Sequence, residues 1–218
     1  MRTLEGFETW ILDLAWSGDA KWLAGCTFEE ELMVVDAVTG QIVVDRPDIR
    51  ATSVDWHQTE PRLAVGELDG SLRLLDPSGK EAWNVRRETE RIWAVRFGPD
   101  GSQLATAENG AIIIWDTQTG EQVSMLNELR ENYKSIDWSP DGKRLVSASD
   151  SSVVVWDVDS RQVAIKLASG SVRTVRWSPD GMSVLAGSWG EGVHLWDATR
   201  GYEEERRRGL SSSKRNQP

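Results

Sequence analysis

The chain has few of the residues that catalysis and metal binding most often use. Among its 218 residues there are one cysteine, Cys26, and two histidines, His57 and His194. One cysteine excludes an internal disulfide and a cysteine-based zinc cluster. Two histidines leave little material for a metal site or for Ser/His or Cys/His catalysis, and no phosphate-binding loop or Gly-x-Ser-x-Gly elbow occurs. We therefore expect a protein that is not an enzyme and that carries no metal and no cofactor.

Long apolar runs and an excess of positive charge are also missing. No run approaches the roughly 20 residues that a membrane helix needs, and residues 1–5 lack the apolar core of a secretory signal. We expect a cytoplasmic location, without excluding the nucleus, and no membrane contact. The 25 Lys and Arg face 35 Asp and Glu, which gives a net charge of −10. Such a body repels nucleic acid at a distance, so a nucleic-acid partner is disfavoured but stays open.

What the chain does contain is a unit of about 40 residues that repeats five times. An apolar stretch that ends in an aspartate recurs, and the aspartates are Asp36, Asp76, Asp116, Asp157 and Asp197. The last three follow a tryptophan, at Trp115, Trp156 and Trp196. An aromatic residue before a turn recurs with nearly the same period, at Trp16, Trp56, Phe97, Trp138 and Trp177. Two markers that keep one period indicate a repeated supersecondary unit.

Each unit is predicted to form four short strands. The recurring aromatic ends the first strand, and Pro-Asp-Gly at residues 140–142 and 179–181 is a tight-turn signal. The second strand follows, the third ends at the recurring aspartate, and a further turn leads to the fourth. β-branched residues with turns every 8 to 12 residues are typical of an all-β fold. A lone sheet with two apolar faces cannot bury them, whereas sheets stacked around an axis can.

These repeats resemble the WD-repeat β-propeller family over about residues 3–199. The resemblance implies an all-β, five-bladed propeller of four-stranded antiparallel blades in residues 1–200. The repeat cores are approximately 10–47, 50–87, 91–128, 132–168 and 171–200. The residues after 201 are too charged to pack as a fourth strand, so we expect residues 2–6 to supply the strand that closes the last blade. The rival is an open, partial propeller completed by a partner or by self-association. Residues 201–218 are expected to form a charged, disordered tail.

The sequence departs from the family at several positions. The family's aspartate six residues before the Trp is kept only as Asp69 and Asp150, and its Gly-His pair is missing. Stability should therefore depend more on packing between blades. The aromatic residues expected in that core are Trp16, Trp56, Phe97, Trp115, Trp138, Trp156, Trp177 and Trp196. Asp13, Asp55 and Asp137 could approach the channel or pack between blades, but nothing selects a catalytic pair of the glycosidase type.

The resemblance further implies a partner-binding face at the loops that enter the first strands. The family's contact positions correspond here to Trp10, Leu12, Phe28, Arg50, Thr52, Arg91, Trp93, Lys134, Arg173 and Trp189. Cations and tryptophans on an acidic protein favour a protein or peptide partner with an acidic segment. The predicted function is thus a non-catalytic scaffold, with no small-molecule substrate. The alternative is a structural subunit of a larger RNA- or chromatin-associated assembly that docks through its blade sides.

Overall fold

The computed structural model describes residues 9–29, 31–87, 91–169, 172–188 and 192–198, and the regular elements among them are β-strands. These residues contain no helix that could cross a membrane. The strands form five antiparallel sheets, each made of strands that are consecutive in the sequence. The predicted all-β class and the five repeats are confirmed.

We call the sheets blades 1 to 5 in chain order. Blade 1 holds β1 (Ile11–Trp16), β2 (Trp22–Thr27), β3 (Leu32–Asp36) and β4 (Ile42–Arg46). Blade 2 holds β5 (Ala51–Trp56), β6 (Leu63–Glu67), β7 (Ser71–Leu75) and β8 (Glu81–Arg86). Blade 3 holds β9 (Ala94–Phe97), β10 (Gln103–Glu108), β11 (Ala111–Asp116) and β12 (Gln122–Leu126). Blade 4 holds β13 (Tyr133–Trp138), β14 (Arg144–Ser149), β15 (Ser152–Asp157) and β16 (Gln162–Ser169). Blade 5 holds β17 (Thr174–Trp177), β18 (Ser183–Ser188) and β19 (Gly192–Asp197).

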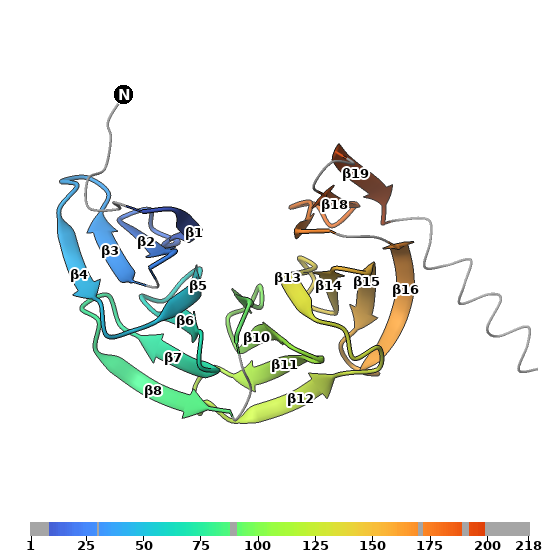
Figure 1. Ribbon diagram of the computed structural model, residues 1–218, viewed down its shortest axis with the longest axis horizontal. Coiled ribbons are helices and arrows are strands. Elements are labelled where there is room, and N and C mark those ends of the chain that lie inside the picture. Colours follow the sequence, from blue (N-terminus) through green and yellow to red (C-terminus); the bar gives the residue numbers. More distant parts are fainter. Residues whose placement is uncertain (1–8, 30, 88–90, 170–171, 189–191, 199–218) are drawn as a thin grey trace, which may run out of the picture.

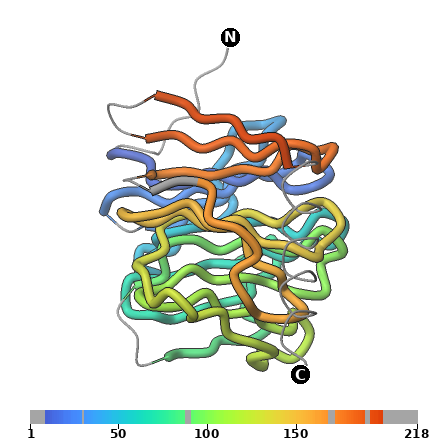
Figure 2. Tube along the Cα trace, turned by 90° about the vertical axis from the view of Figure 1, so that its right-hand side faces the viewer, coloured from blue at the N-terminus to red at the C-terminus, as the bar shows by residue number. Residues whose placement is uncertain are grey.

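The blades stand side by side in an arc, with the first strand of each blade on the inside (Figure 1). The described part of the arc is open between β1 and β19. Figure 2 shows the strands running across the arc, so that their turns lie on two opposite faces. The predicted closing strand at residues 2–6 and the predicted tail at 201–218 lie outside the described residues, and blade 5 has three described strands.

The hydrophobic core lies between the blades, in four clusters that match the four junctions. In each cluster, apolar residues of the second and third strands of one blade face the first strand of the next. At the first junction Leu32 and Val34 of β3 pack in the same buried cluster as Val54 and Trp56 of β5. The recurring aromatic of the following blade contributes a large buried side chain to each junction, through Trp56, Phe97, Trp138 and Trp177.

The recurring aspartate, which ends the third strand or, as Asp76 in blade 2, directly follows it, closes the next turn in blades 1 to 4. Asp36 Oδ1 accepts hydrogen bonds from the backbone N–H groups of Val38 and Thr39, at 2.9 and 2.6 Å. The same kind of bond to a turn N–H recurs at Asp76, Asp116 and Asp157. Asp197 ends β19 and is exposed. The aspartate that recurs in the sequence therefore has the same structural role in each of these blades, which is to accept hydrogen bonds from the turn after the third strand.

Part of the family's tryptophan network forms despite the missing residues. The indole N–H of Trp115 donates to Thr106 Oγ1 at 3.0 Å, and that of Trp156 donates to Ser147 Oγ at 2.8 Å. Asp150 is paired instead with Lys134, and Asp69 Oδ1 accepts from the Ser71 N–H at 3.0 Å. The two retained aspartates thus serve turns and ion pairs.

One of the eight predicted core aromatics is not in the core. Six are buried and Trp196 is partly buried against the cluster at the last junction. Trp16 is 55% exposed, so its prediction as a core residue is wrong. The reason is its place on the first blade, because no described blade covers the outer side of β1.

Candidate functional site

The inner strands bring one predicted contact residue from each blade into a common small pocket. These residues are Leu12, Thr52, Trp93, Lys134 and Arg173. Each is the fourth residue before the aromatic that ends its inner strand, so the repeat places all five at the same height in the arc. The pocket has a volume of about 190 Å³. We call it the inner-strand pocket. It is smaller than a typical pocket for a drug-sized ligand and suits a single side chain.

The lining of the inner-strand pocket is mostly cationic. Its other members are Asp13, Ala94, Arg96, Ser135, Thr174 and Arg176. Together with Lys134 and Arg173, the two added arginines give four cations against one carboxylate. Cations therefore outnumber carboxylates in the pocket, whereas acidic residues outnumber basic ones in the whole chain, which has a net charge of −10. An anionic group would therefore find locally favourable charge on a protein that otherwise repels it.

Trp93 is the aromatic wall of this pocket and is held from several sides. Its indole N–H donates to Asn109 Oδ1 at 3.0 Å. The Arg91 guanidinium lies 4.3 Å from the ring centroid, and Lys134 Nζ lies 5.7 Å from it. Both distances fall within the range of a cation–π interaction. The tryptophan is half-buried and fixed in orientation, as a recognition residue needs to be.

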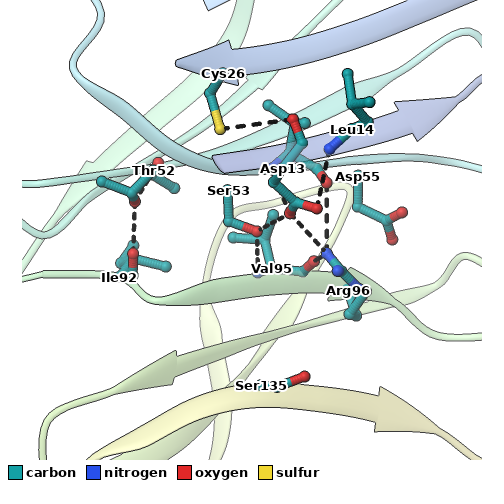
Figure 3. Close-up of polar contacts among 12 residues, drawn as sticks. Asp13, Leu14, Cys26, Thr52, Ser53, Asp55, Ile92, Val95, Arg96 and Ser135 are labelled. Carbon is teal, nitrogen blue, oxygen red and sulfur yellow. Dashed lines mark hydrogen bonds and ion pairs between the residues drawn. The ribbon is translucent and has the colours of Figure 1, made fainter. Parts of the chain in front are cut away.

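Beneath the pocket, polar side chains connect the inner strands of neighbouring blades (Figure 3). Asp13 Oδ2 accepts from Ser53 Oγ at 2.6 Å and from Arg96 Nη1 at 3.3 Å. Ser53 Oγ in turn accepts from the Val95 N–H at 3.1 Å. Asp13 thus joins blade 1 to blades 2 and 3. We call these contacts the inter-blade seam.

The inter-blade seam repeats farther along the arc with alternating charge. The position just before the recurring aromatic is Asp55 in blade 2, Arg96 in blade 3, Asp137 in blade 4 and Arg176 in blade 5. Asp55 Oδ2 accepts from the N–H of Phe97, and Asp137 Oδ2 accepts from that of Trp177, both at 2.7 Å. The two carboxylates therefore bind the backbone of the next blade, while Arg96, which is paired with Asp13, and Arg176 line the pocket.

The electrostatic environment of the inter-blade seam shifts its pKa values. Burial raises the pKa of Asp55 to about 6, although Arg96 and the Phe97 N–H act in the opposite direction. Burial also raises the pKa of Asp137. Desolvation first, and repulsion from Arg96 second, lower the pKa of the Arg176 guanidinium. By contrast, the pKa of Arg96 is raised, because attraction from Asp13 and Asp55 outweighs the desolvation that acts in the opposite direction.

The other predicted contact residues lie around the inner-strand pocket or outside the described residues. Trp10 and Phe28 are exposed and pack on each other at the rim of blade 1, with ring centroids 6.1 Å apart. Arg50 is exposed just before β5, and the Arg91 guanidinium lies over the Trp93 ring. Trp189 lies outside the part of the chain that the structure describes.

The sequence reasoning did not include Arg96 and Arg176 in the binding face. Both occupy the position directly before the recurring aromatic, where blades 2 and 4 carry an aspartate. The alternation Asp-Trp, Arg-Phe, Asp-Trp, Arg-Trp is visible in the sequence and was the signal for a charged ring. It was missed because the residue alternation of a strand does not by itself say which side faces the axis.

Two larger clefts lie at the opposite face, between turns of neighbouring blades. One of about 390 Å³ lies between the first turns of blades 3 and 4, and one of about 410 Å³ lies between those of blades 1 and 2. Their carboxylates are engaged locally: Asp141 Oδ1 accepts from Ser139 Oγ, and Asp100 Oδ1 accepts from Ser102 Oγ. The described residues contain no group of three or more His, Cys, Asp or Glu placed to hold a metal ion.

Comparison with known proteins agrees with this architecture. The family model "WD domain, G-beta repeat" matches residues 82–116, 126–157 and 163–197. WD repeat-containing protein 1 of Mus musculus is 34% identical over 199 residues, and its Gallus gallus counterpart is 35% identical. Each alignment covers 86% of this chain and 26% of the relative. The chain thus spans about a quarter of the length of these relatives.

Proposed function

Because the chain belongs to the WD-repeat family, we propose that it is a non-catalytic scaffold that holds an acidic segment of a partner protein in the inner-strand pocket. The family relation supports a role in protein interaction. The observation that carries the finer proposal is the lining of the pocket, which sets four cations and a fixed tryptophan against one carboxylate. We also propose that the protein is located in the cytoplasm.

The chemistry of the inner-strand pocket favours a carboxylate or phosphorylated side chain. Arg173 and Arg176 can donate charge-assisted hydrogen bonds, which are stronger than neutral ones. Lys134 is already paired with Asp150, so its charge is shared between that pair and a ligand. Trp93 offers apolar contact to the stem of the bound side chain. A flexible acidic segment of a partner could thus insert one side chain into the inner-strand pocket. The neighbouring acidic residues of that segment would then face Arg50 at the rim.

Catalysis is not part of this proposal because the inner-strand pocket lacks a pair of carboxylates to act as acid and base. Asp13 is the one carboxylate among its described lining residues, and Ser53, Val54 and Arg96 all donate to its Oδ2. Asp55 and Asp137 accept from the backbone of neighbouring blades. These carboxylates hold the blades together.

The proposal is tested by titrating the protein against a fluorescein-labelled peptide of alternating Glu and Gly and measuring anisotropy. Arg173→Glu should weaken binding by about tenfold or more, since it replaces a charge-assisted contact with repulsion. Lys143→Glu makes the same charge change at an exposed turn of the opposite face and should leave affinity within about twofold.

Equal losses in the two variants would show that net charge alone drives binding and would remove the pocket from the proposal. A peptide in which Gln replaces Glu should not bind. Tighter binding of single-stranded RNA, with the same dependence on Arg173, would favour the nucleic-acid alternative instead.

A further inference from the structure

The inner-strand pocket has a cationic side and an apolar side, which come from different blades. Leu12 of blade 1 lines the pocket and is 38% exposed, while its neighbour Asp13 is engaged in the inter-blade seam. In blade 2 the Thr52 hydroxyl lies 2.9 Å from the carbonyl oxygen of Gly66 and 2.5 Å from that of Ile92, so its proton is used within the fold. The cations of the pocket belong to blades 3 to 5, and they are Arg96, Lys134, Arg173 and Arg176. A bound anion therefore meets charged donors on one side of the pocket.

The residue that directly follows the second strand shows the same division between blades. In blade 3 this residue is Asn109, whose Oδ1 accepts from the indole N–H of Trp93 at 3.0 Å. In blade 4 it is Asp150, which is ion-paired with Lys134. In blade 1 the same position holds Phe28, whose side chain is 64% exposed. A polar group thus supports the pocket residue in blades 3 and 4, whereas blade 1 presents an exposed aromatic ring.

Phe28 and Trp10 form an exposed aromatic pair next to the apolar side of the pocket. Their ring centroids are 6.1 Å apart, and the Phe28 N–H donates to the Trp10 carbonyl oxygen at 2.6 Å, which ties the end of β2 to the start of β1. Trp10 is 81% exposed, and neither ring lines the pocket itself. Leu12 lies two residues after Trp10 and does line the pocket, so it connects the two. We call Trp10, Leu12 and Phe28 the apolar rim.

The size of the pocket means that a bound segment must also contact its surroundings. A volume of about 190 Å³ holds one side chain, so the neighbours of that side chain lie at the rim. In an extended segment, side chains two residues apart point to the same side and are separated by about 7 Å, which is also the span of the two residues from Leu12 to Trp10. We propose, on the basis of the proposed function, that the acidic segment of the partner carries a large apolar side chain two residues from its acidic one, and that this apolar side chain binds the apolar rim.

Charge favours such a segment over a second copy of the chain as the occupant of the apolar rim. A second copy would bring its own net charge of −10 against that of the first, and the two bodies would repel each other. A short segment brings only a few acidic groups, and these are directed at the cations of the pocket. Exposed aromatic side chains beside a charged pocket are also the residue types that contribute most to binding at protein interfaces.

The test compares two fluorescein-labelled peptides of equal length and charge by fluorescence anisotropy with the full chain. The first peptide is Glu-Gly-Leu-Gly-Glu-Gly-Leu-Gly-Glu, in which every Glu has a Leu two residues away in whichever direction the peptide binds. The second peptide has Ser in place of each Leu. The Leu peptide should bind about fivefold more tightly, because it buries apolar surface on the rim. Salt should weaken both peptides but leave the ratio of their affinities unchanged, since screening acts on the charges alone.

Substitutions at the apolar rim separate its contribution from that of the pocket. Phe28→Ser and Trp10→Ser should each bring the affinities of the two peptides to within about twofold of each other, without changing the affinity of the Ser peptide. Both side chains are exposed, so the variants should fold. The matched control is Val38→Ser in the turn after β3, where the side chain is 77% exposed, and it should keep the fivefold ratio. Arg173→Glu should weaken the binding of both peptides by about tenfold or more.

The outcomes distinguish this inference from the proposed function. If the Ser peptide binds through Arg173 and the Leu peptide binds no more tightly, the inference is overturned and the proposed function stands. If neither peptide binds, both are overturned. A gain from Leu that survives Phe28→Ser and Trp10→Ser would place the apolar contact elsewhere. A melting temperature lowered by more than about 5 °C in either variant would show that the chain itself covers the rim, and self-association in sedimentation that Trp10→Ser abolishes would show a second copy there; either result contradicts the proposal.

Discussion

At the level of single residues, the account depends on charges placed between the inner strands. Asp55 and Asp137 stabilise the next blade through its backbone, while Arg96 and Arg176 supply positive charge to the inner-strand pocket. The same sequence position thus serves two tasks in alternate blades. Burial of the carboxylates is costly, and the raised pKa of Asp55 expresses that cost.

Asp55→Asn should therefore stabilise the protein more at high pH than at low pH. The pKa of Asp55 rises from 3.8 to about 6 on folding, so its contribution to stability is greatest below pH 3.8 and is lost as the pH rises through 6. The asparagine can still accept from the Phe97 N–H but carries no charge. The difference in unfolding free energy between variant and wild type should grow by about 1 kcal/mol from pH 5 to pH 8 in urea titrations.

Asp116→Asn is the matched control, because hydrogen bonds from Thr119 lower the pKa of this partly exposed carboxylate. Asp116 stays charged in both the folded and unfolded chain over that pH range, so the effect of its substitution should be constant between pH 5 and pH 8. A constant difference for Asp55→Asn as well would contradict the role assigned to burial.

At the level of strands and blades, the inter-blade seam and the four apolar clusters hold neighbouring sheets in register. Ser53 has a central place in the seam, since it donates to Asp13 of blade 1 and accepts from Val95 of blade 3. Its hydroxyl thus connects three consecutive blades across two junctions. No sequence motif marks this serine, which explains why sequence analysis did not select it.

Ser53→Ala should destabilise the fold by about 1–3 kcal/mol, because it leaves the buried N–H of Val95 without its acceptor. Ser102→Ala removes an exposed turn hydroxyl that bonds only within its own turn, and should change stability by less than about 0.5 kcal/mol. Equilibrium unfolding in urea measures both. Similar small effects of the two substitutions would mean that the hydrogen bonds of the inter-blade seam add nothing to the stability that packing already provides.

Strand positions were largely predictable because turn residues and the recurring aromatic follow local rules. The first strand of every blade ends at the recurring aromatic residue, as predicted. The exposure of Trp16 was not predictable, because burial at a junction depends on whether another blade is present and not on the residue itself. For the same reason the repeat predicts five blades but not the angle between them.

At the level of the whole molecule, the arc gathers one residue from each blade at a common height. The family resemblance implied contact positions at Leu12, Thr52, Trp93, Lys134 and Arg173, and in the structure these residues line one pocket. Arg96 and Arg176 join them at positions that the alternation of Asp and Arg marks in the sequence, but which side of each inner strand faces the axis is given only by the fold. The outer rim residues Trp10 and Phe28 remain apart from the pocket.

Photo-crosslinking of an acidic peptide tests the central claim most directly. The alternating Glu and Gly peptide, carrying one benzophenone group, is irradiated with the full chain, and the crosslinked residues are identified by mass spectrometry. The account predicts crosslinks to inner-strand residues of several blades, above all Trp93, Lys134 and Arg173. Crosslinks confined to the turns at residues 98–103 and 138–142, or to the outer strands, would contradict it.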